Sequence, residues 1–470
     1  MKKIQIKIFN TLTGKKDLFR PRKGKNVNMF VCGPTVYDYS HIGHARTYIA
    51  FDCFVKYLKQ IGYKVFYLQN ITDLDDKIIA RARERGVSPK DLALAFEKEH
   101  LKAMKTLGVT SVSKYARATS YIKEITNQIE RLEKKGFAYK LEGDGMYFDI
   151  SKFKNYGKLA GRTVLDAEDS VSRIDYSKDK RNRGDFCIWK FKQQDEEPSW
   201  KAPFGEGRPG WHIEDTAITE RFFGAQYDIH GGARDLIFPH HEAEVSLMES
   251  ISGKSPLARY WMHGGFLTVE GQKMGKSLGN FITLPDILNR CPVNYLRFFV
   301  AKNLWRSPVD YSESVMVEVK SAVNKVEEFL RKLRAQKVKA KNSHTTKNLI
   351  KNLKTNFYSE LADDFNTPKA FAVLFDFIKE ANRLLSEGNV SKAECAEIYK
   401  FFEDVNKIFG FIDFKKVNKV IPSKIKKLAQ DREKFRQNKE WDKADHVRKE
   451  IEKQGYTVED TSTGPAVRQI

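Results

Sequence analysis

The hydrophobic and polar positions of the N-terminal region alternate in blocks that predict a parallel α/β fold. Residues 27–32 (VNMFVC) form an apolar run typical of a buried strand, and a helical pattern follows over residues 43–61. A second apolar strand is expected at 64–71, and the helix after it opens with acidic residues, as the helix dipole favours. Strand, helix, strand and helix in this order are typical of a βαβ unit and a parallel sheet. In such sheets ligands bind beyond the carboxyl ends of the strands, where residues 32–44 and Thr72 lie.

The pattern changes twice further along the chain. Residues 116–201 are charged and rich in turns, which indicates a domain inserted into the parallel-sheet domain. Beyond residue 312 the pattern is mostly helical. The sequence therefore predicts a Rossmann-like parallel-sheet domain with an inserted domain, followed by a helical bundle and a small C-terminal domain. The expected ranges are 1–115 and 202–265 for the two halves of the parallel-sheet domain, 116–201 for the inserted domain, 266–320 for a connecting region, 321–412 for the bundle and 413–470 for the C-terminal domain.

Charge and cysteine content indicate a partner and a compartment. The 83 Lys and Arg residues exceed the 61 Asp and Glu residues, for a formal net charge of +22. This excess suits a polyanion such as RNA or DNA, although a lysine-rich surface can also reflect genome composition. The five cysteines are scattered without a C-x-x-C pair, which favours a reducing compartment. With no signal peptide and no apolar run of about 20 residues, we expect a cytoplasmic protein that does not enter a membrane.

Two short motifs point to one ATP site. The HIGH motif at 41–44 places two histidines at the start of a predicted helix, near free backbone N–H groups that favour phosphate, and Gly43 allows close approach. The KMGKS motif at 273–277 places two flexible lysines in a loop, which suits a mobile clamp on a triphosphate. Either motif alone has an ordinary meaning, a helix cap or a solvated basic turn. Together they predict adenylation of a carboxylate.

A third constellation could hold a metal. His240 and Glu244 are four residues apart and share a helix face, as a pair of metal ligands would. With Cys32 from a strand end they offer one nitrogen, one oxygen and one sulfur donor. Histidine and glutamate in the first turn of a helix more often act as caps, so spacing alone leaves both meanings open.

These segments together resemble the cysteinyl-tRNA synthetases, a family of class I aminoacyl-tRNA synthetases. The resemblance is collinear over nearly the whole chain. The segments that carry it are FVCGPTVYDYSHIGHARTYIAFD, NITDLDDKII, GRPGWHIE, DIHGGARDLIFPHHEAE, KMGKSLGNFIT, DDFNTPKAFAVLF and DREKFRQNKEWDKADHVRKEI.

The resemblance implies that ATP and L-cysteine react to cysteinyl-adenylate and pyrophosphate, and that the cysteinyl group then passes to the 3′ end of tRNA(Cys). By position, His41 and His44 would stabilise the α-phosphate, and Lys273 and Lys276 the leaving pyrophosphate, with Mg²⁺. The implied ATP-binding residues are Gly33, His41, Gly43, His44, Lys273 and Lys276. Gly275 replaces the serine of the family motif at a loop position, so we expect little effect.

The resemblance also implies a zinc ion that binds the substrate thiolate. The matching ligand positions are Cys32, Asp215, His240 and Glu244, and the cysteine-binding positions are Cys32, Thr72 and Trp211. Asp215 is a departure, because the family normally has cysteine there. An aspartate ligand keeps the charge and can still close a zinc site. Two alternatives stay open: another metal or another fourth ligand such as His212, or loss of the metal with altered amino-acid selectivity.

The basic charge would then serve tRNA binding by the helices after residue 312 and by the C-terminal anticodon-binding domain. Candidate contacts are Trp441, Arg432, Arg436 and Arg448, although packing is the more common role of a tryptophan such as Trp441. Range 266–320 would contact the tRNA stem, and the family implies a monomer. Rival interpretations are a related ligase that joins adenylated cysteine to an amino sugar, and a catalytically silent tRNA-binding protein.

Overall fold

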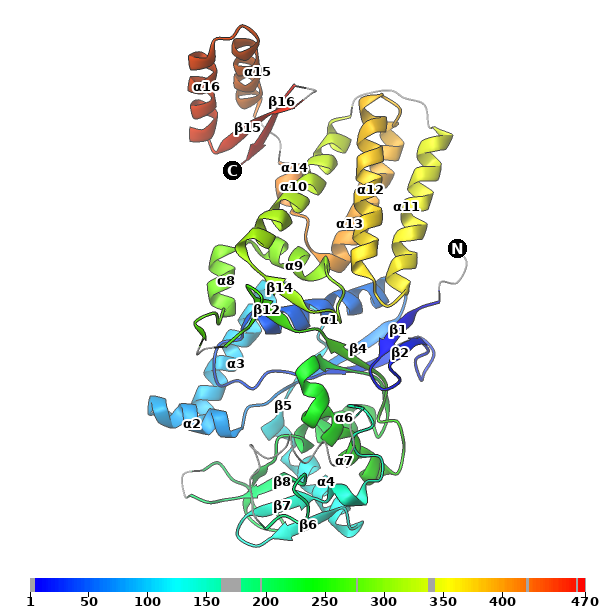
Figure 1. Cartoon of the computed structure of the whole chain (residues 1–470), viewed down its shortest axis with the longest axis vertical. Helices are drawn as coiled ribbons and strands as arrows, with labels where there is room; N and C mark the ends of the chain where they lie inside the picture. The colour runs from blue at the N-terminus through cyan, green and yellow to red at the C-terminus, as the bar shows by residue number, and fades with distance from the viewer. Residues whose placement is uncertain are drawn as a thin grey trace. The chain divides into compact units, whose positions relative to one another are not determined.

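A five-stranded parallel sheet in the order β11-β10-β3-β4-β5 forms the centre of the N-terminal half of the chain (Figure 1). Its strands are β3 (Asn26–Val31), β4 (Lys64–Ile71), β5 (Lys114–Arg117), β10 (Tyr227–Ala233) and β11 (Ala258–Gly264). The two apolar strands expected from the sequence pair in parallel as β3 and β4. Strand β3 pairs with β4 on one side and with β10 on the other. The carboxyl ends of β3 and β10 therefore flank a topological switch point.

The computed structural model describes residues 5–161, 179–194, 197–275, 278–336, 343–419, 422–461 and 464–469. The chain divides into two compact units, a first unit of Met1–Ile412 and a second unit of Asp413–Ile470. In the described residues, no helix is both long enough and apolar enough to cross a membrane.

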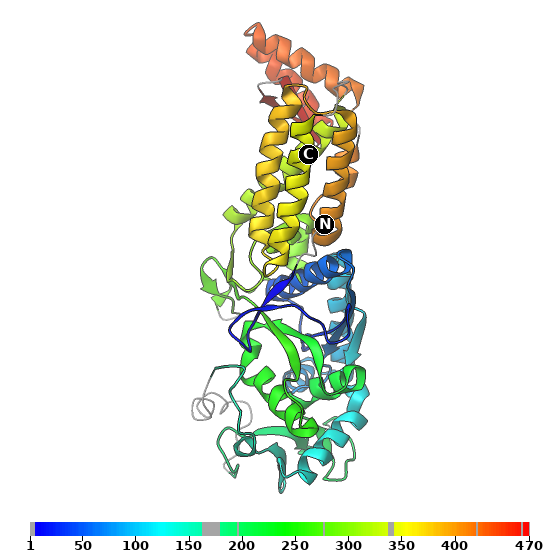
Figure 2. The ribbon, with the colours of Figure 1, turned by 90° about the vertical axis from the view of Figure 1, so that its right-hand side faces the viewer.

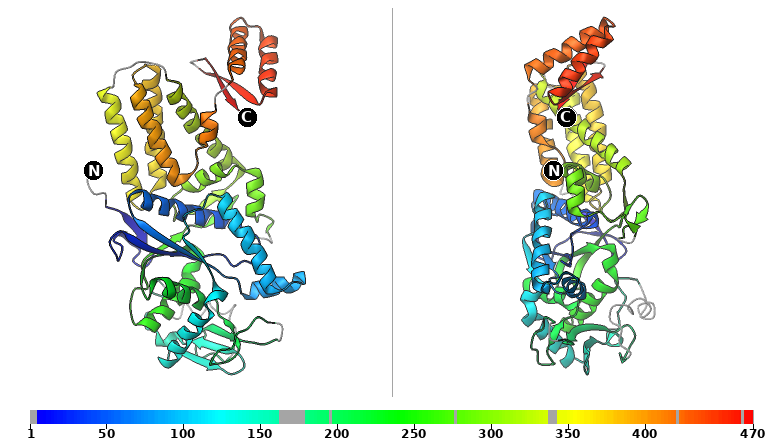
Figure 3. Two further views of the ribbon diagram at one scale, coloured as in Figure 1. Left: turned by 180° about the vertical axis from the view of Figure 1, so that it is seen from behind. Right: turned by 90° about the vertical axis from the view of Figure 1, so that its left-hand side faces the viewer.

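Helices cover both faces of the parallel sheet. On one face α1 (Ile42–Gln60) lies between the sheet and helices α9 (Val293–Ala301) and α13 (Lys392–Phe409), as Figure 1 shows. On the other face lie α6 (Ile213–Phe223) and α7 (Glu242–Ser252). Helices α2 (Asp76–Arg85) and α3 (Pro89–Thr106) pack together, as the view from behind in Figure 3 also shows. A short antiparallel pair, β1 (Lys7–Asn10) and β2 (Lys15–Leu18), lies beside β11.

The inserted domain contains α4 (Ile122–Lys134) and a four-stranded antiparallel sheet. Its strands are β6 (Ala138–Leu141), β7 (Gly145–Phe148), β8 (Phe186–Phe191) and β9 (Gly207–Pro209). The sheet continues past residue 201, the expected end of this domain, because β9 pairs with β8 through Trp189, Lys190 and Phe191. The short helix η1 (Ala118–Tyr121) precedes α4, and the short helix η2 (Ile150–Lys152) follows β7 within the domain. One apolar core joins Ile129, Trp189 and Met248, so the insertion is packed onto α7.

The rest of the first unit is mainly helical, as predicted. A three-stranded sheet contains β12 (Leu267–Val269), β13 (Gln272–Lys273) and β14 (Val309–Tyr311). Helices α8 (Leu284–Arg290) and α9 lie between β13 and β14 in the sequence. The bundle helices are α10 (Glu313–Ala335), α11 (His344–Ala362), α12 (Thr367–Ser386) and α13. Figure 2 shows this bundle and the inserted domain at opposite ends of the parallel-sheet domain. The bundle begins at Glu313, before the expected residue 321, because the Ser312 side chain caps α10.

The second unit contains α14 (Phe414–Asn418), α15 (Ser423–Gln437), α16 (Trp441–Lys453) and an antiparallel hairpin, β15 (Tyr456–Thr461) and β16 (Gly464–Gln469). Helices α15 and α16 agree with the sequence pattern, whereas the hairpin was not expected. Ile425, Ile451 and Val458 belong to a small core that joins both helices to the hairpin. In β15 only Tyr456 and Val458 alternate with polar residues, and β16 begins with Gly464 and Pro465, so the apolar alternation is too brief to reveal the hairpin.

Candidate active site and metal centre

The HIGH motif forms the N-terminus of α1. His41 is the N-cap residue, and its Nδ1 accepts a hydrogen bond from the Gly43 N–H at 3.1 Å. The His41 N–H donates in turn to His44 Nδ1 at 3.1 Å, and the two ring centroids are 4.0 Å apart. Enclosure by protein atoms lowers the pKa of His44 well below its usual value, and His41 adds to this shift. The two imidazoles therefore lie together at a helix N-terminus, where anions bind.

The two ATP motifs lie side by side. The Ile42 N–H donates to the Ile282 carbonyl at 3.0 Å, and the Leu284 N–H donates to the Ser40 carbonyl at 2.7 Å. The segment that follows KMGKS is thereby bonded to the residues that precede α1. In addition, the Met274 methyl group lies 3.8 Å from the position a Cβ would take on Gly43. The two motifs are more than 200 residues apart in the sequence and lie together in the fold.

The KMGKS loop begins in the hairpin of β12 and β13. Lys273 ends β13, pairs with Thr268 across the hairpin and is exposed. Asn280 braces the loop, because its Oδ1 accepts from the Gly275 N–H at 2.9 Å and its Nδ2 donates to the Lys273 carbonyl at 3.2 Å. Lys276 lies outside the described residues. The sequence pattern led to no predicted role for Asn280. An asparagine amide that closes a loop of small residues is nevertheless a recognisable signal.

Gly33 and Thr72 lie at the carboxyl ends of β3 and β4. The Gly33 N–H donates to Asn70 Oδ1 at 2.5 Å, and a Cβ at Gly33 would lie 1.8 Å from the Asn70 carbonyl oxygen. The strands are therefore too close here for any residue except glycine. Thr72 is buried and its hydroxyl donates to Glu214 Oε1 at 2.5 Å. Both residues lie at the carboxyl edge of the parallel sheet.

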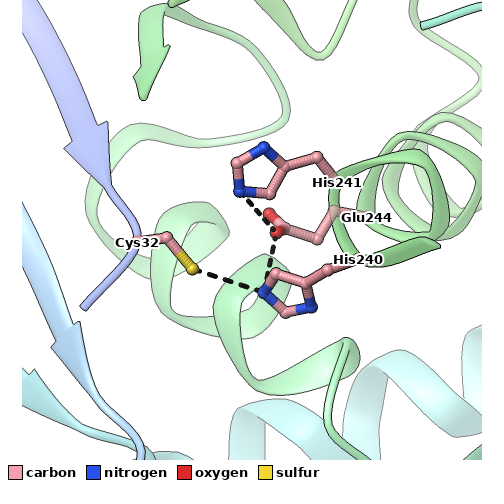
Figure 4. Close-up of side chains that lie close together, drawn as sticks. All are labelled: Cys32, His240, His241 and Glu244. Carbon is pink, nitrogen blue, oxygen red and sulfur yellow. Dashed lines mark hydrogen bonds and ion pairs between the residues drawn. The ribbon is translucent and has the colours of Figure 1, made fainter. Parts of the chain in front are cut away.

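Four predicted metal-ligand positions converge near the carboxyl end of β3. Cys32 follows β3, Asp215 lies in the first turn of α6, and His240 and Glu244 flank the start of α7. Cys32 Sγ is 3.3 Å from both Asp215 Oδ2 and His240 Nε2. His240 Nε2 is 3.0 Å from Asp215 Oδ2 and 3.3 Å from Glu244 Oε1. All four side chains are buried, and Figure 4 shows the Cys32 side chain directed toward His240 and Glu244.

His241 is a further donor in this cluster. One ligand atom from each of Cys32, His240, His241 and Glu244 lies within 4.8 Å of the others. His241 Nε2 is 3.9 Å from Glu244 Oε1, as the dashed line in Figure 4 marks. The sequence interpretation missed His241, although its i, i+3 spacing to Glu244 also places both on one helix face.

Trp211 and His212 lie behind His240. The Trp211 ring stacks on the His240 ring with centroids 4.4 Å apart. His212 Nδ1 is 2.8 Å from His240 Nδ1, so it contacts the nitrogen that faces away from the donor cluster. Burial lowers the pKa of His212 well below its usual value. Both residues thus orient His240, with its Nε2 directed at Cys32, Asp215 and Glu244.

The electrostatics of the cluster favour a cation. Asp215 Oδ1, both Glu244 carboxylate oxygens and His241 Nε2 are buried without a hydrogen-bond partner. Burial raises the pKa of the Cys32 thiol well above its usual value, and the Asp215 and Glu244 carboxylates raise it further. The pKa of Glu244 is raised by burial and by Asp215. Orphaned oxygen and nitrogen atoms around a thiol are the donors that zinc binds, so the residues present fit a metal ion.

The candidate RNA-contacting residues of the second unit differ in exposure. Trp441 is 56% exposed, so the packing interpretation is wrong for it; it begins α16, and the Arg436 guanidinium lies over its ring at 5.7 Å. Arg432 is buried and pairs with Asp460 at 2.5 Å, which gives it a structural role. Arg448 pairs with Glu452 at 3.1 Å along α16.

Comparison with known proteins gives consistent matches. Residues 18–321 match the family described as tRNA synthetases class I (C) catalytic domain, and residues 356–413 match the DALR domain. A protein from Thermococcus gammatolerans named "Cysteine--tRNA ligase" is 42% identical over 479 residues, covering 99% of both chains. A protein of the same name from Carboxydothermus hydrogenoformans is 40% identical over 470 residues, covering 99% of this chain and 100% of that protein.

Solved structures share the fold. The Mycobacterium tuberculosis methionyl-tRNA synthetase in complex with methionyl-adenylate has a TM-score of 0.61 at 16% identity, covering 82% of this chain and 90% of its own. The Agrobacterium radiobacter K84 LeuRS–tRNA–LeuAMS complex has a TM-score of 0.63 at 10% identity, covering 84% and 85%. With a family match over most of the chain and full-length relatives at about 40% identity, the chain belongs to the cysteine--tRNA ligase family of class I tRNA synthetases.

Proposed function

We propose that this chain activates L-cysteine with ATP to cysteinyl-adenylate and transfers the cysteinyl group to the 3′ end of tRNA(Cys). The observation that carries the proposal is the junction of residues 40–42 with 282–284 beside the buried Cys32, Asp215, His240 and Glu244 cluster. A nucleotide site and a thiol-binding metal site at one sheet edge are what adenylation of cysteine requires. The name shared by the relatives that match the full length supports the same activity.

ATP is held at the N-terminus of α1. His41 and His44 donate to the α-phosphate, where charge accumulates as a cysteine carboxylate oxygen attacks phosphorus and the bond to the β-phosphate breaks. Lys273 and Lys276 neutralise the departing pyrophosphate, together with the Mg²⁺ that accompanies ATP. Gly33 and Gly43 give the nucleotide access to the backbone. The side-by-side motifs and the exposed position of Lys273 support this assignment.

Cys32, Asp215, His240 and Glu244 hold a zinc ion, and Thr72 and Trp211 line the cysteine pocket with Cys32. A bound zinc ion would supply a Lewis acid of borderline softness that prefers a thiolate to a hydroxyl, which would separate cysteine from serine more sharply than shape alone. The unpartnered Asp215 Oδ1 and Glu244 oxygens support this donor set. His212 is a less suitable fourth ligand than Asp215, because it contacts the His240 nitrogen that faces away from the donor cluster.

The chain works as a monomer in the cytoplasm with tRNA(Cys) as its macromolecular partner. Range 266–320 contacts the tRNA stem, the bundle of 321–412 supports it, and 413–470 binds the anticodon. The formal charge of +22 and the match to the DALR domain support this arrangement. The amino-sugar ligase is not proposed, because the relatives named as tRNA ligases match this chain through its C-terminal unit as well.

The test is ATP–pyrophosphate exchange by the full chain with cysteine or serine, before and after zinc removal by a chelator. We expect exchange with cysteine only, lost on chelation and regained with added zinc, and cysteinylation of tRNA(Cys) in the same preparation. Elemental analysis should give stoichiometric zinc. Equal exchange with serine, or cysteine exchange by metal-free protein, would refute the zinc–thiolate part of the proposal, and absence of cysteine exchange would refute the activity.

A further inference from the structure

Glu214 has a buried carboxyl group that has no role in the proposed ATP and metal sites. It is the second residue of α6, directly before Asp215, and only 2% of its surface is exposed. Its Oε1 accepts a hydrogen bond from the Thr72 hydroxyl at 2.5 Å. No lysine, arginine or histidine in the described ranges forms an ion pair with it. Glutamate is almost never this buried unless it is paired, so a cationic partner is missing.

The neighbouring carboxylates are either hydrogen-bonded within the fold or part of the metal donor set. Asp73 accepts hydrogen bonds from the Thr119 backbone N–H at 3.0 Å and the Thr119 hydroxyl at 2.5 Å. Asp75 caps α2 by accepting from the Lys77 N–H at 2.8 Å. Asp215 faces Cys32 in the metal donor set. Glu214 is therefore the carboxylate of this group that is left to pair with a ligand.

The Thr72 hydroxyl can only accept a hydrogen bond from a ligand. Its single hydrogen points to Glu214, and Asn70 Nδ2 donates to its oxygen at 3.3 Å. The orientation of the Asn70 amide follows from its other bond, since its Oδ1 must accept the Gly33 N–H. A hydroxyl oxygen has two lone pairs, so one remains for a donor outside the protein. The site thus combines a buried carboxyl group with a free acceptor lone pair on the Thr72 hydroxyl, and it fits an ammonium group.

We propose that Glu214 and Thr72 form the subsite for the α-ammonium group of the amino-acid substrate. Thr72 contacts the ammonium group, while Glu214 supplies the opposing charge and holds the hydroxyl proton away from it. Because Glu214 and Asp215 are consecutive in α6, the ammonium subsite adjoins the metal donors that take the thiol. The pocket then selects thiol-containing carboxylic acids that carry an amino group on the α-carbon. This inference rests on the proposed function.

The test compares L-cysteine with 3-mercaptopropanoate, which lacks only the amino group, as competing ligands in ATP–pyrophosphate exchange. Loss of one hydrogen bond to a charged group corresponds to roughly 10–100-fold in affinity. We expect E214Q to weaken the binding of cysteine by this factor. The affinity for 3-mercaptopropanoate and the zinc content should stay unchanged. The matched control is E242Q, another buried glutamate in the same unit, whose Oε2 accepts from the Leu159 and Ala160 N–H groups. It should keep the preference for cysteine.

Two threonine variants keep the proposal testable if E214Q does not fold. T72V should lose the preference for cysteine as E214Q does, and T72S, which retains the hydroxyl, should preserve it. An unchanged preference in E214Q or T72V, or an equal loss of both thiols, would overturn the ammonium subsite. Failure of the unmodified chain to exchange with cysteine would instead count against the proposed function, so the two outcomes are distinguishable.

Discussion

Arg297 of α9 is a buried cation whose removal should destabilise the whole first unit. Its guanidinium donates to Asp52 Oδ2 at 2.9 Å, to the Phe409 carbonyl at 2.6 Å and to the Leu107 carbonyl at 2.9 Å. It thereby joins α1, the loop after α3 and the end of bundle helix α13. In R297M the Asp52 carboxylate keeps Lys56 at 2.6 Å, but the buried carbonyls lose their charged donor.

The expected cost follows from these contacts. Removing one partner of a buried ion pair typically costs about 3–5 kcal/mol, and the retained Lys56 places R297M near the lower end. With an unfolding entropy of ~2.1 cal/mol/K per residue, the 412 residues of the first unit unfold with about 0.9 kcal/mol/K. The melting temperature should then fall by about 3–4 °C.

Differential scanning calorimetry at a fixed scan rate measures this shift, with R383M as the matched control. Arg383 pairs with Glu380 and Glu387 on the surface of α12, where its side chain is 53% exposed. Exposed pairs contribute little, so R383M should melt as the unmodified chain does. If R297M melts no lower than R383M, the buried contacts of Arg297 do not stabilise the junction and the reasoning is wrong.

Three further predictions concern the site and its surroundings. G33A should lower stability by about 1–3 kcal/mol and reduce zinc content, because its Cβ would meet the Asn70 carbonyl oxygen, whereas G264A has only ordinary contacts near 3.7 Å. Calorimetry and elemental analysis check both, and equal effects would contradict the steric argument. D215A should weaken zinc binding by more than the ~10–100-fold typical of an outer hydrogen-bonding partner, and D215C should retain zinc; chelator competition measures this, and undiminished zinc in D215A would exclude Asp215 as a ligand. Burial lowers the pKa of His100 to about 4 from an ordinary 6.5. The unfolded chain therefore binds the extra proton as pH falls below 6.5, and stability is lost. The stability advantage of the unmodified chain over H100Q should shrink by about 2 kcal/mol between pH 7.5 and pH 5, and a constant difference in urea unfolding would refute it.

The sequence was sufficient for the elements that define the site because their signals are local. An apolar run before Cys32 and a glycine-bounded helical pattern after His44 are enough to place β3, α1 and the turn between them. The i, i+4 spacing of His240 and Glu244 likewise survives folding, even though His240 lies in the irregular turn η4 (Ile237–His241) before α7. In the hairpin of β15 and β16 this local signal is limited to the brief alternation of Tyr456 and Val458 with polar residues.

What the sequence could not supply is the pairing of side chains across elements. Glu214 and Thr72 are 142 positions apart and meet only because α6 packs under the end of β4. His241 and His212 each neighbour a predicted residue in sequence, yet one faces the donor cluster and the other faces away. Spacing fixes which helix face a residue occupies but not what that face meets. A carboxyl group next to a predicted metal ligand therefore looks redundant in the sequence, and the separate use proposed for it becomes visible only when its burial and its one hydroxyl partner are known together.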